Sequence, residues 1–178
     1  MSDAETDDAM DFSLADLAGV EMSQIAEVSF EGLPAGMYLF KGTEAKLEKV
    51  RNAKDEPRGK ISLQMEVIEV KAITERGVDT PEDWLGKKHR ENIWIVPEKP
   101  EEGLGMFARF FNSIGLSAAG PLGGCDDADG NHIDGCLDTF ADHEFVGKIH
   151  KKPRKGDPTQ KDSVLTPIDV RQGQKKAA

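Results

Sequence analysis

The chain has 178 residues, 38% of them hydrophobic, and a formal net charge of −10 at pH 7. This length allows one domain of about 140 residues with a hydrophobic core once a charged terminus is set aside. No apolar stretch approaches the ~18 residues of a membrane span, and the acidic start lacks signal-peptide character. Two cysteines are too few for a secreted disulfide framework. We therefore expect a cytoplasmic protein with reduced thiols, no membrane association and no cofactor.

The charge is unevenly distributed along the chain. Residues 1–40 carry nine acidic residues and no lysine or arginine, whereas residues 148–178 carry nine basic residues and three acidic ones. An acidic end beside a basic body is typical of a tail that imitates a polyanion, and also of a tail that only keeps the protein soluble. We expect an acidic, disordered arm at 1–22, a folded domain at 23–171 and a flexible basic fringe at 172–178.

The first two expected strands form a long hairpin. A Pro- and Gly-containing turn at 33–36 leads into a strand over 37–50, and a polar loop over 51–59 leads into an alternating strand over 60–72. The apolar residues of the first strand change parity at Gly42. A parity change at a glycine predicts a β-bulge or a sharp bend at that position.

The remaining elements are a strand, a helix and two more strands. Alternation predicts a third strand over 88–96, with its isoleucines on one face and Trp94 on the other. Apolar residues at helical spacing predict a helix over 101–115, which ends at a glycine. After a loop rich in Gly and Asp, we expect a fourth strand over 144–152. A polar loop then precedes a fifth strand around 164–170.

The expected order is therefore β-β-β-α-β-β, and it contains no βαβ alternation. The fold class that this order predicts is mainly β with one principal helix. A bend in a long first strand and a helix between strands three and four are typical of an OB-like, five-stranded Greek-key barrel. An unrelated small β-sandwich is the alternative that the pattern leaves open.

Five segments also resemble a known family. They are Leu33-Pro34-Ala35-Gly36-Met37-Tyr38, the strand from Ile61 to Val67, Glu91-Asn92-Ile93-Trp94-Ile95, a Phe-rich helix from Met106 to Gly115, and Glu144-Phe145-Val146-Gly147-Lys148. Over roughly residues 33–170 the chain resembles bacteriophage-encoded single-stranded DNA-binding proteins. The resemblance implies an OB-like fold, single-strand binding without catalysis, a role in phage DNA replication or recombination, and a location in the host cytoplasm. Here the acidic segment is N-terminal, whereas such proteins commonly carry it at the C-terminus.

Single-strand binding requires cations spaced along a groove and flat side chains on which bases stack. Basic residues gather in the first hairpin, in the third strand, and in the fourth strand with its following loop, and we expect them to line one groove. The candidate single-stranded DNA-binding residues are Lys46, Lys49, Arg51, Lys54, Arg58, Lys60, Lys88, Arg90, Trp94, Lys148, His150, Lys152 and Arg154. For any one lysine the alternative is an ordinary solvated position, and for Trp94 it is burial in the core. Trp84 is expected to plug its own loop.

A second candidate set comprises Cys125, His132, Cys136 and His143, which lie within nineteen residues. These residue types suit tetrahedral zinc, but no Cys-x-x-Cys or His-x-x-x-His pair fixes the spacing. We therefore predict no metal site and interpret the four as isolated buried or loop residues. The chain also lacks a Gly-rich phosphate loop, a nucleophile elbow and a paired-His zinc helix, so we expect no catalytic residues.

The sequence thus predicts a non-catalytic protein that binds single-stranded DNA without sequence preference. The acidic arm is expected to occupy the groove in the absence of DNA or to contact replication or recombination proteins. The alternative is a phage protein-interaction or structural module whose acidic surface binds a protein. Homo-oligomerisation is compatible with either function, and the residues do not distinguish DNA from RNA.

Overall fold

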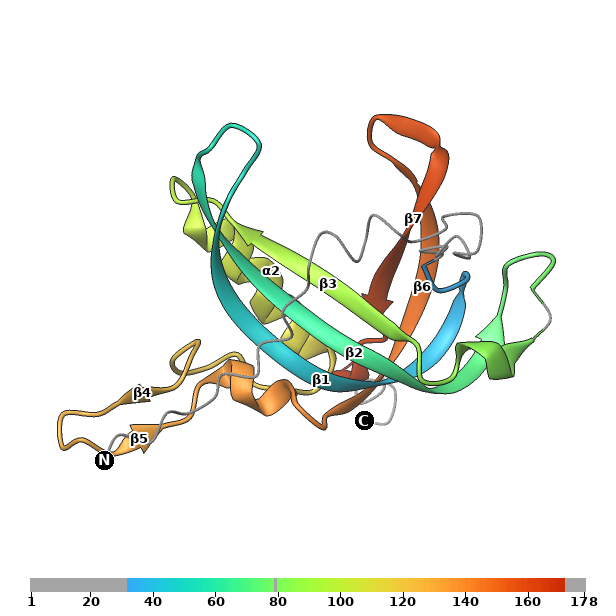
Figure 1. Ribbon diagram of the computed structural model, residues 1–178. Helices are drawn as coiled ribbons and strands as arrows, with labels where there is room; N and C mark the ends of the chain where they lie inside the picture. Colours follow the sequence, from blue (N-terminus) through green and yellow to red (C-terminus); the bar gives the residue numbers. More distant parts are fainter. Residues whose placement is uncertain (1–31, 79, 172–178) are drawn as a thin grey trace, which may run out of the picture. The chain divides into compact units, whose positions relative to one another are not determined.

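The computed structural model describes residues 32–78 and 80–171, which belong to one compact unit. The expectations for the arm at 1–22 and the fringe at 172–178 lie outside the described residues. Within those residues the protein is mainly β, with one principal helix and an antiparallel five-stranded sheet (Figure 1). The expected mainly-β class with one principal helix is confirmed.

The strands and helices follow the expected order, with a small ribbon added between the helix and the fourth long strand. They are β1 (Gly36–Arg51), β2 (Pro57–Ile73), the 3₁₀ turn η2 (Pro81–Trp84), β3 (Lys88–Ile95), α2 (Pro100–Ser113), the ribbon strands β4 (Cys125–Asp126) and β5 (His132–Ile133), η3 (Cys136–Phe140), β6 (Glu144–Arg154) and β7 (Asp157–Pro167). None of the helices in the described part of the chain is both long enough and apolar enough to span a membrane.

The main sheet has the strand order β3-β2-β1-β6-β7, and all neighbours are antiparallel. Strand β6 pairs with β1 on the side opposite to β2, so the first four long strands have the spatial order β3-β2-β1-β6. This order is a Greek-key arrangement. Strand β7 starts earlier than the sequence predicted, because residues 157–161, expected in the loop over 153–161, belong to the strand: Asp157 pairs with Arg154 and Lys161 pairs with Pro153 of β6. This part of the hairpin buries neither face, so its residues show no alternation that a sequence pattern could detect.

The predicted irregularity at Gly42 is confirmed by a shift in the β1–β2 register between Gly42 and Glu44. The Gly42 N–H donates to His143 O at 2.8 Å, and Asp142 N–H donates to Gly42 O at 2.9 Å. A Cβ at position 42 would overlap the carbonyl oxygen of Phe140. The shift allows Phe40 before the bulge and Ala45 after it to pack against the same core.

Helix α2 covers the inner face of the sheet, behind β3 in the view of Figure 1. Its residues Phe107 and Phe111 and its C-cap Ile114 are buried at helical spacing, and the Phe111 ring stacks on Phe140 with centroids 5.9 Å apart. Pro100 occupies the first turn, where its missing N–H leaves no helical bond unmade. The core therefore lies between α2, η3 and the inward side chains of β1, β2 and β6.

The sheet does not close into a barrel by backbone pairing, since no ladder joins β3 to β7 in the ranges 32–78 and 80–171. A side chain bridges this seam instead: the Leu165 N–H donates to Glu91 Oε1 at 3.0 Å. Nε2 of buried His89 lies 2.8 Å from the same oxygen. The carboxylate thus accepts a hydrogen bond from each of the two unpaired edges.

Substitution of Gly42 by alanine should destabilise the fold by about 3 kcal/mol, because the new methyl group meets a backbone carbonyl that cannot move independently. The matched control is Gly105→Ala in α2, where a Cβ meets nothing within 4 Å. That change should stabilise the protein by about 0.5–1 kcal/mol through helix propensity. Urea unfolding of the two variants measures both effects, and equal stability of the two would contradict the role given to Gly42.

Candidate nucleic-acid interface

The outer face of β2 and β3 carries a row of polar and basic side chains around one tryptophan. The β2–β3 register sets Lys60 opposite Trp94, Ser62 opposite Asn92, Gln64 opposite Arg90 and Glu66 opposite Lys88. The intervening residues Ile61, Leu63 and Met65 are fully buried, so the row lies on the opposite face of β2, where Ser62 alone of its four β2 members is buried, at 5% exposure. The alternation predicted for the third strand is therefore confirmed.

Trp94 is 47% exposed, so the alternative that it packs in the core is wrong. Its cross-strand neighbour is Lys60, and Asn92 and Arg90 follow on the same face of β3. The exposed Trp94 indole can stack on a nucleobase while the neighbouring lysine binds a phosphate. Trp84, in contrast, is partly buried and packs against the core, as predicted for a loop plug.

Two of the predicted lysines on this face are held by glutamates. Lys60 Nζ lies 2.7 Å from Glu48 Oε2, and Lys46 Nζ lies 2.7 Å from Glu44 Oε1. The hydrogen bond from Lys60, followed by its Coulomb attraction, lowers the pKa of the Glu48 carboxyl. The hydrogen bond to Glu44 raises the pKa of Lys46 in the same way. A phosphate that binds either lysine must therefore displace a carboxylate.

Lys88 and Arg90 are the cations of this face for which no ion pair is found within the described ranges. Both are exposed on β3, in phase with Trp94. Arg90 contributes the smallest of the Coulombic effects that lower the pKa of Glu48. These two positive charges are the ones most available to a phosphate.

The end of the β1–β2 hairpin holds the next group of candidates. Arg51 pairs with Asp55 at 3.2 Å, Arg58 pairs with Glu56 at 3.3 Å, and Lys54 is exposed at the tip. Lys49 does not join the tryptophan face. The β1 alternation sets it in phase with Leu47, on the opposite side of the hairpin from Lys60 and Trp94.

The third group lies on β6 and its hairpin with β7. Lys148, His150 and Lys152 alternate outward along β6, and Arg154 is held by Asp162 at 2.9 Å. Strand β1 separates them from β2 in the sheet, so they do not continue the Trp94 row. Figure 1 shows, however, that the β1–β2 and β6–β7 hairpins both extend in the same direction beyond the sheet. The structure thus brings together Lys46, Lys60, Lys88, Arg90 and Trp94, leaves Lys49 on the opposite side of the hairpin, and places the β6–β7 candidates as a separate flank.

Acidic residues are concentrated away from these hairpins. Residues 98–147 contain ten Asp or Glu and two Lys or Arg. Six of these acidic residues lie between Asp126 and Asp142, in the segment of the β4–β5 ribbon and η3, and in Figure 1 the ribbon extends away from the two hairpin ends. The separation leaves the hairpin side of the sheet more positive than the net charge of the chain suggests.

The Cys and His candidates for zinc do not form a cluster. Cys125 is exposed, whereas Cys136 is buried, and both are free thiols. Burial raises the pKa of the Cys136 thiol, which disfavours the thiolate that zinc requires. His143 Nε2 lies 2.7 Å from Ile114 O, and exposed His132 lies between Asp126 and Asp134. Across residues 32–78 and 80–171, no three metal-ligating side chains are grouped so as to hold an ion.

Comparison with known proteins assigns no family to this geometry. Neither models of known protein families nor curated protein sequences match the chain. The resemblance to phage single-strand-binding proteins therefore remains an expectation, and the candidate interface rests on its own residues.

The sequence pattern did not identify several residues of this face. Gln64 and Ser62 share the row with Trp94 and Asn92, and the alternation of β2 was a sufficient signal for them. Glu44 and Glu48 also belong to the face, but their ion pairs depend on the β1–β2 register. Because the bulge shifts that register, these ion pairs could not be predicted from the sequence alone.

Replacement of Glu48 by glutamine should tighten binding of single-stranded DNA about two- to five-fold at low salt, because Lys60 loses its competing carboxylate. The matched control is Glu102→Gln, which removes the partner of Lys99 on α2 at 3.3 Å. Fluorescence anisotropy with labelled oligothymidine measures both variants. Equal changes in the two would show that only net charge matters, and not the position of Glu48.

Proposed function

We propose that this protein binds single-stranded DNA without sequence preference and without catalysis, through the outer face of β2 and β3. The observation that supports this most strongly is Trp94, half exposed on an otherwise regular strand, in phase with Lys60, Arg90 and Lys88. An exposed aromatic side chain flanked by cations meets the two requirements of single-strand binding, which are base stacking and phosphate neutralisation.

An OB-like fold is the second part of the proposal. In OB folds, oligonucleotides bind the face of the second and third strands, between the loop after the first strand and the loop after the fourth. Strands β1, β2, β3, β6 and β7 have a Greek-key order in which these parts correspond to the Trp94 face, the β1–β2 hairpin and the β6–β7 hairpin. The Glu91 bridge at the β3–β7 seam occupies the place where a fully closed barrel would have a ladder.

The proposed binding mode divides the work among three groups of residues. Trp94 stacks on a base, and Lys88 and Arg90 bind phosphates on the same face. Lys60 and Lys46 exchange their glutamate partners for phosphate when the strand arrives. Lys148 and Lys152 on β6 extend the positive potential along the flanking hairpin. The resemblance noted in the sequence favours a role in phage DNA replication or recombination.

The competing proposal is a protein-interaction module that binds its partner through acidic surface. The concentration of acidic residues between 98 and 147 favours it. The two functions differ in their response to salt: binding through phosphates releases counterions, and log affinity then falls linearly with log salt concentration.

Oligothymidine titration at several salt concentrations tests the proposal. We expect quenching of Trp94 fluorescence, measured in a Trp84→Phe variant that isolates its signal, and a salt slope steeper than about −2. Trp94→Ala should weaken binding at least about fivefold through the lost stack, and Arg90→Gln should reduce the slope by about one.

The matched control for Arg90 is Arg109→Gln, which removes an exposed cation from α2 on the other side of the sheet. It should leave the slope unchanged. A slope near zero, or no binding of oligothymidine, would favour the protein-interaction module instead.

A further inference from the structure

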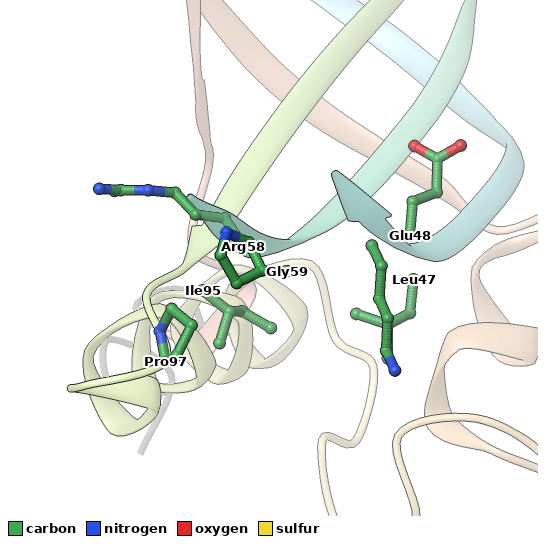
Figure 2. A pocket seen from close by; sticks show the side chains of 8 residues that line it. Leu47, Glu48, Arg58, Gly59, Ile95 and Pro97 are labelled. Carbon is green, nitrogen blue, oxygen red and sulfur yellow. The ribbon is translucent and has the colours of Figure 1, made fainter. Parts of the chain in front are cut away.

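A pocket of about 480 Å³ opens at the base of the β1–β2 hairpin, on the side opposite the tryptophan face. Figure 2 shows Ile95 and Pro97 on one side of it and Leu47 on the other, with Gly59 between them on β2. Leu47 is 52% exposed although it continues the inward alternation that buries Ile61. The hairpin extends beyond the last β3 residue, Ile95, so no element within residues 32–78 and 80–171 covers this part of its inner face.

The walls of the pocket are aliphatic and carry few hydrogen-bonding groups. Leu47, Ile95 and two prolines supply carbon surface, and none of the lining residues from the described part of the chain is aromatic. A nucleobase enclosed here would lose water from its polar edge without gaining partners, which is unfavourable. A bulky apolar side chain has no polar edge to desolvate, and its burial is favourable. The lining therefore favours a peptide over a nucleic-acid strand.

One lysine supplies the charge that a ligand in the pocket can meet. Lys49 lines it, and none of the described residues forms an ion pair with this lysine. The Glu48 carboxylate points away from the pocket in Figure 2 and is held by Lys60 at 2.7 Å. The Arg58 guanidinium also extends away from the pocket in Figure 2 and binds Glu56 through Nη2. A carboxylate on a bound peptide would therefore pair with Lys49.

We propose that this pocket docks an acidic peptide segment of a partner protein. One bulky apolar side chain of the peptide inserts between Leu47 and Ile95, and a flanking carboxylate binds Lys49. The pocket and the Trp94 row lie on opposite faces of the hairpin, so the peptide and a nucleic-acid strand bind independently. The inference goes beyond the proposed function and does not require it.

The test uses the full-length protein and two fluorescein-labelled synthetic peptides. The first has one phenylalanine with two aspartates on each side, and the second has alanine in place of phenylalanine. By fluorescence anisotropy we expect the phenylalanine peptide to bind at least about tenfold more tightly. Leu47→Ser should remove this difference, because it replaces one apolar wall, and Lys49→Gln should weaken both peptides.

Two variants serve as controls. Leu85→Ser changes a leucine that is equally exposed, at 50%, but lies in the β2–β3 connection, and it should leave peptide binding unchanged. Trp94→Ala should also leave it unchanged, so a failure of strand binding and a failure of peptide binding are separable.

Several results would overturn the proposal. Equal affinity for the two peptides, no binding of either, or no effect of Leu47→Ser would each do so. Loss of oligothymidine binding in Leu47→Ser, as severe as in Trp94→Ala, would assign the pocket to the nucleic-acid strand. A dimer that sediments as a monomer after Leu47→Ser would assign it to a second copy of the chain.

Discussion

The close approach of the Phe140 carbonyl to Gly42 is the constraint on which the rest of the sheet depends. Gly42 bonds through both its N–H and its C=O to residues 142–143, which fixes the point where β6 begins beside β1. The bulge at the same residue changes the alternation of β1, so both halves of a sixteen-residue strand pack on one core. Because the core side is set, the outer side is set as well. Glu44, Lys46 and Glu48 then face outward, in line with the row on β2 and β3.

The seam between β3 and β7 is the second determinant of the candidate interface. A backbone ladder there would fix both edges, whereas Glu91 joins them through a single carboxylate oxygen. Removal of this partly buried acceptor would leave the Leu165 N–H without its partner. The contact therefore holds the two edges together, although no backbone ladder joins them within residues 32–78 and 80–171. Strand β3, which presents Trp94, is consequently an edge strand. Its far end is covered by the start of α2, where Gly103 packs closely on Trp94 and Ile95.

Much of this arrangement could be predicted from the sequence, because it depends on patterns within single strands or helices. The alternation of β3 separated Trp94 from its isoleucine neighbours, the apolar spacing predicted α2, and the parity change marked the bulge at Gly42. Features that depend on two distant segments were not predictable. The Glu48–Lys60 pair requires the register after the bulge, and the Glu91 bridge requires the fold of β7 onto β3. The start of β7 was missed because the solvated part of its hairpin has no apolar pattern.

The central claim is that the outer face of β2 and β3 is the surface that binds an unpaired strand. A heteronuclear NMR titration of the full-length protein with oligothymidine tests it most directly, because the two indole signals act as internal reporters. We expect the Trp94 indole and the backbone amides of β2 and β3 to shift progressively, while the Trp84 indole, packed against the core, stays in place. An unchanged Trp94 signal, or shifts confined to the β4–β5 ribbon, would contradict it.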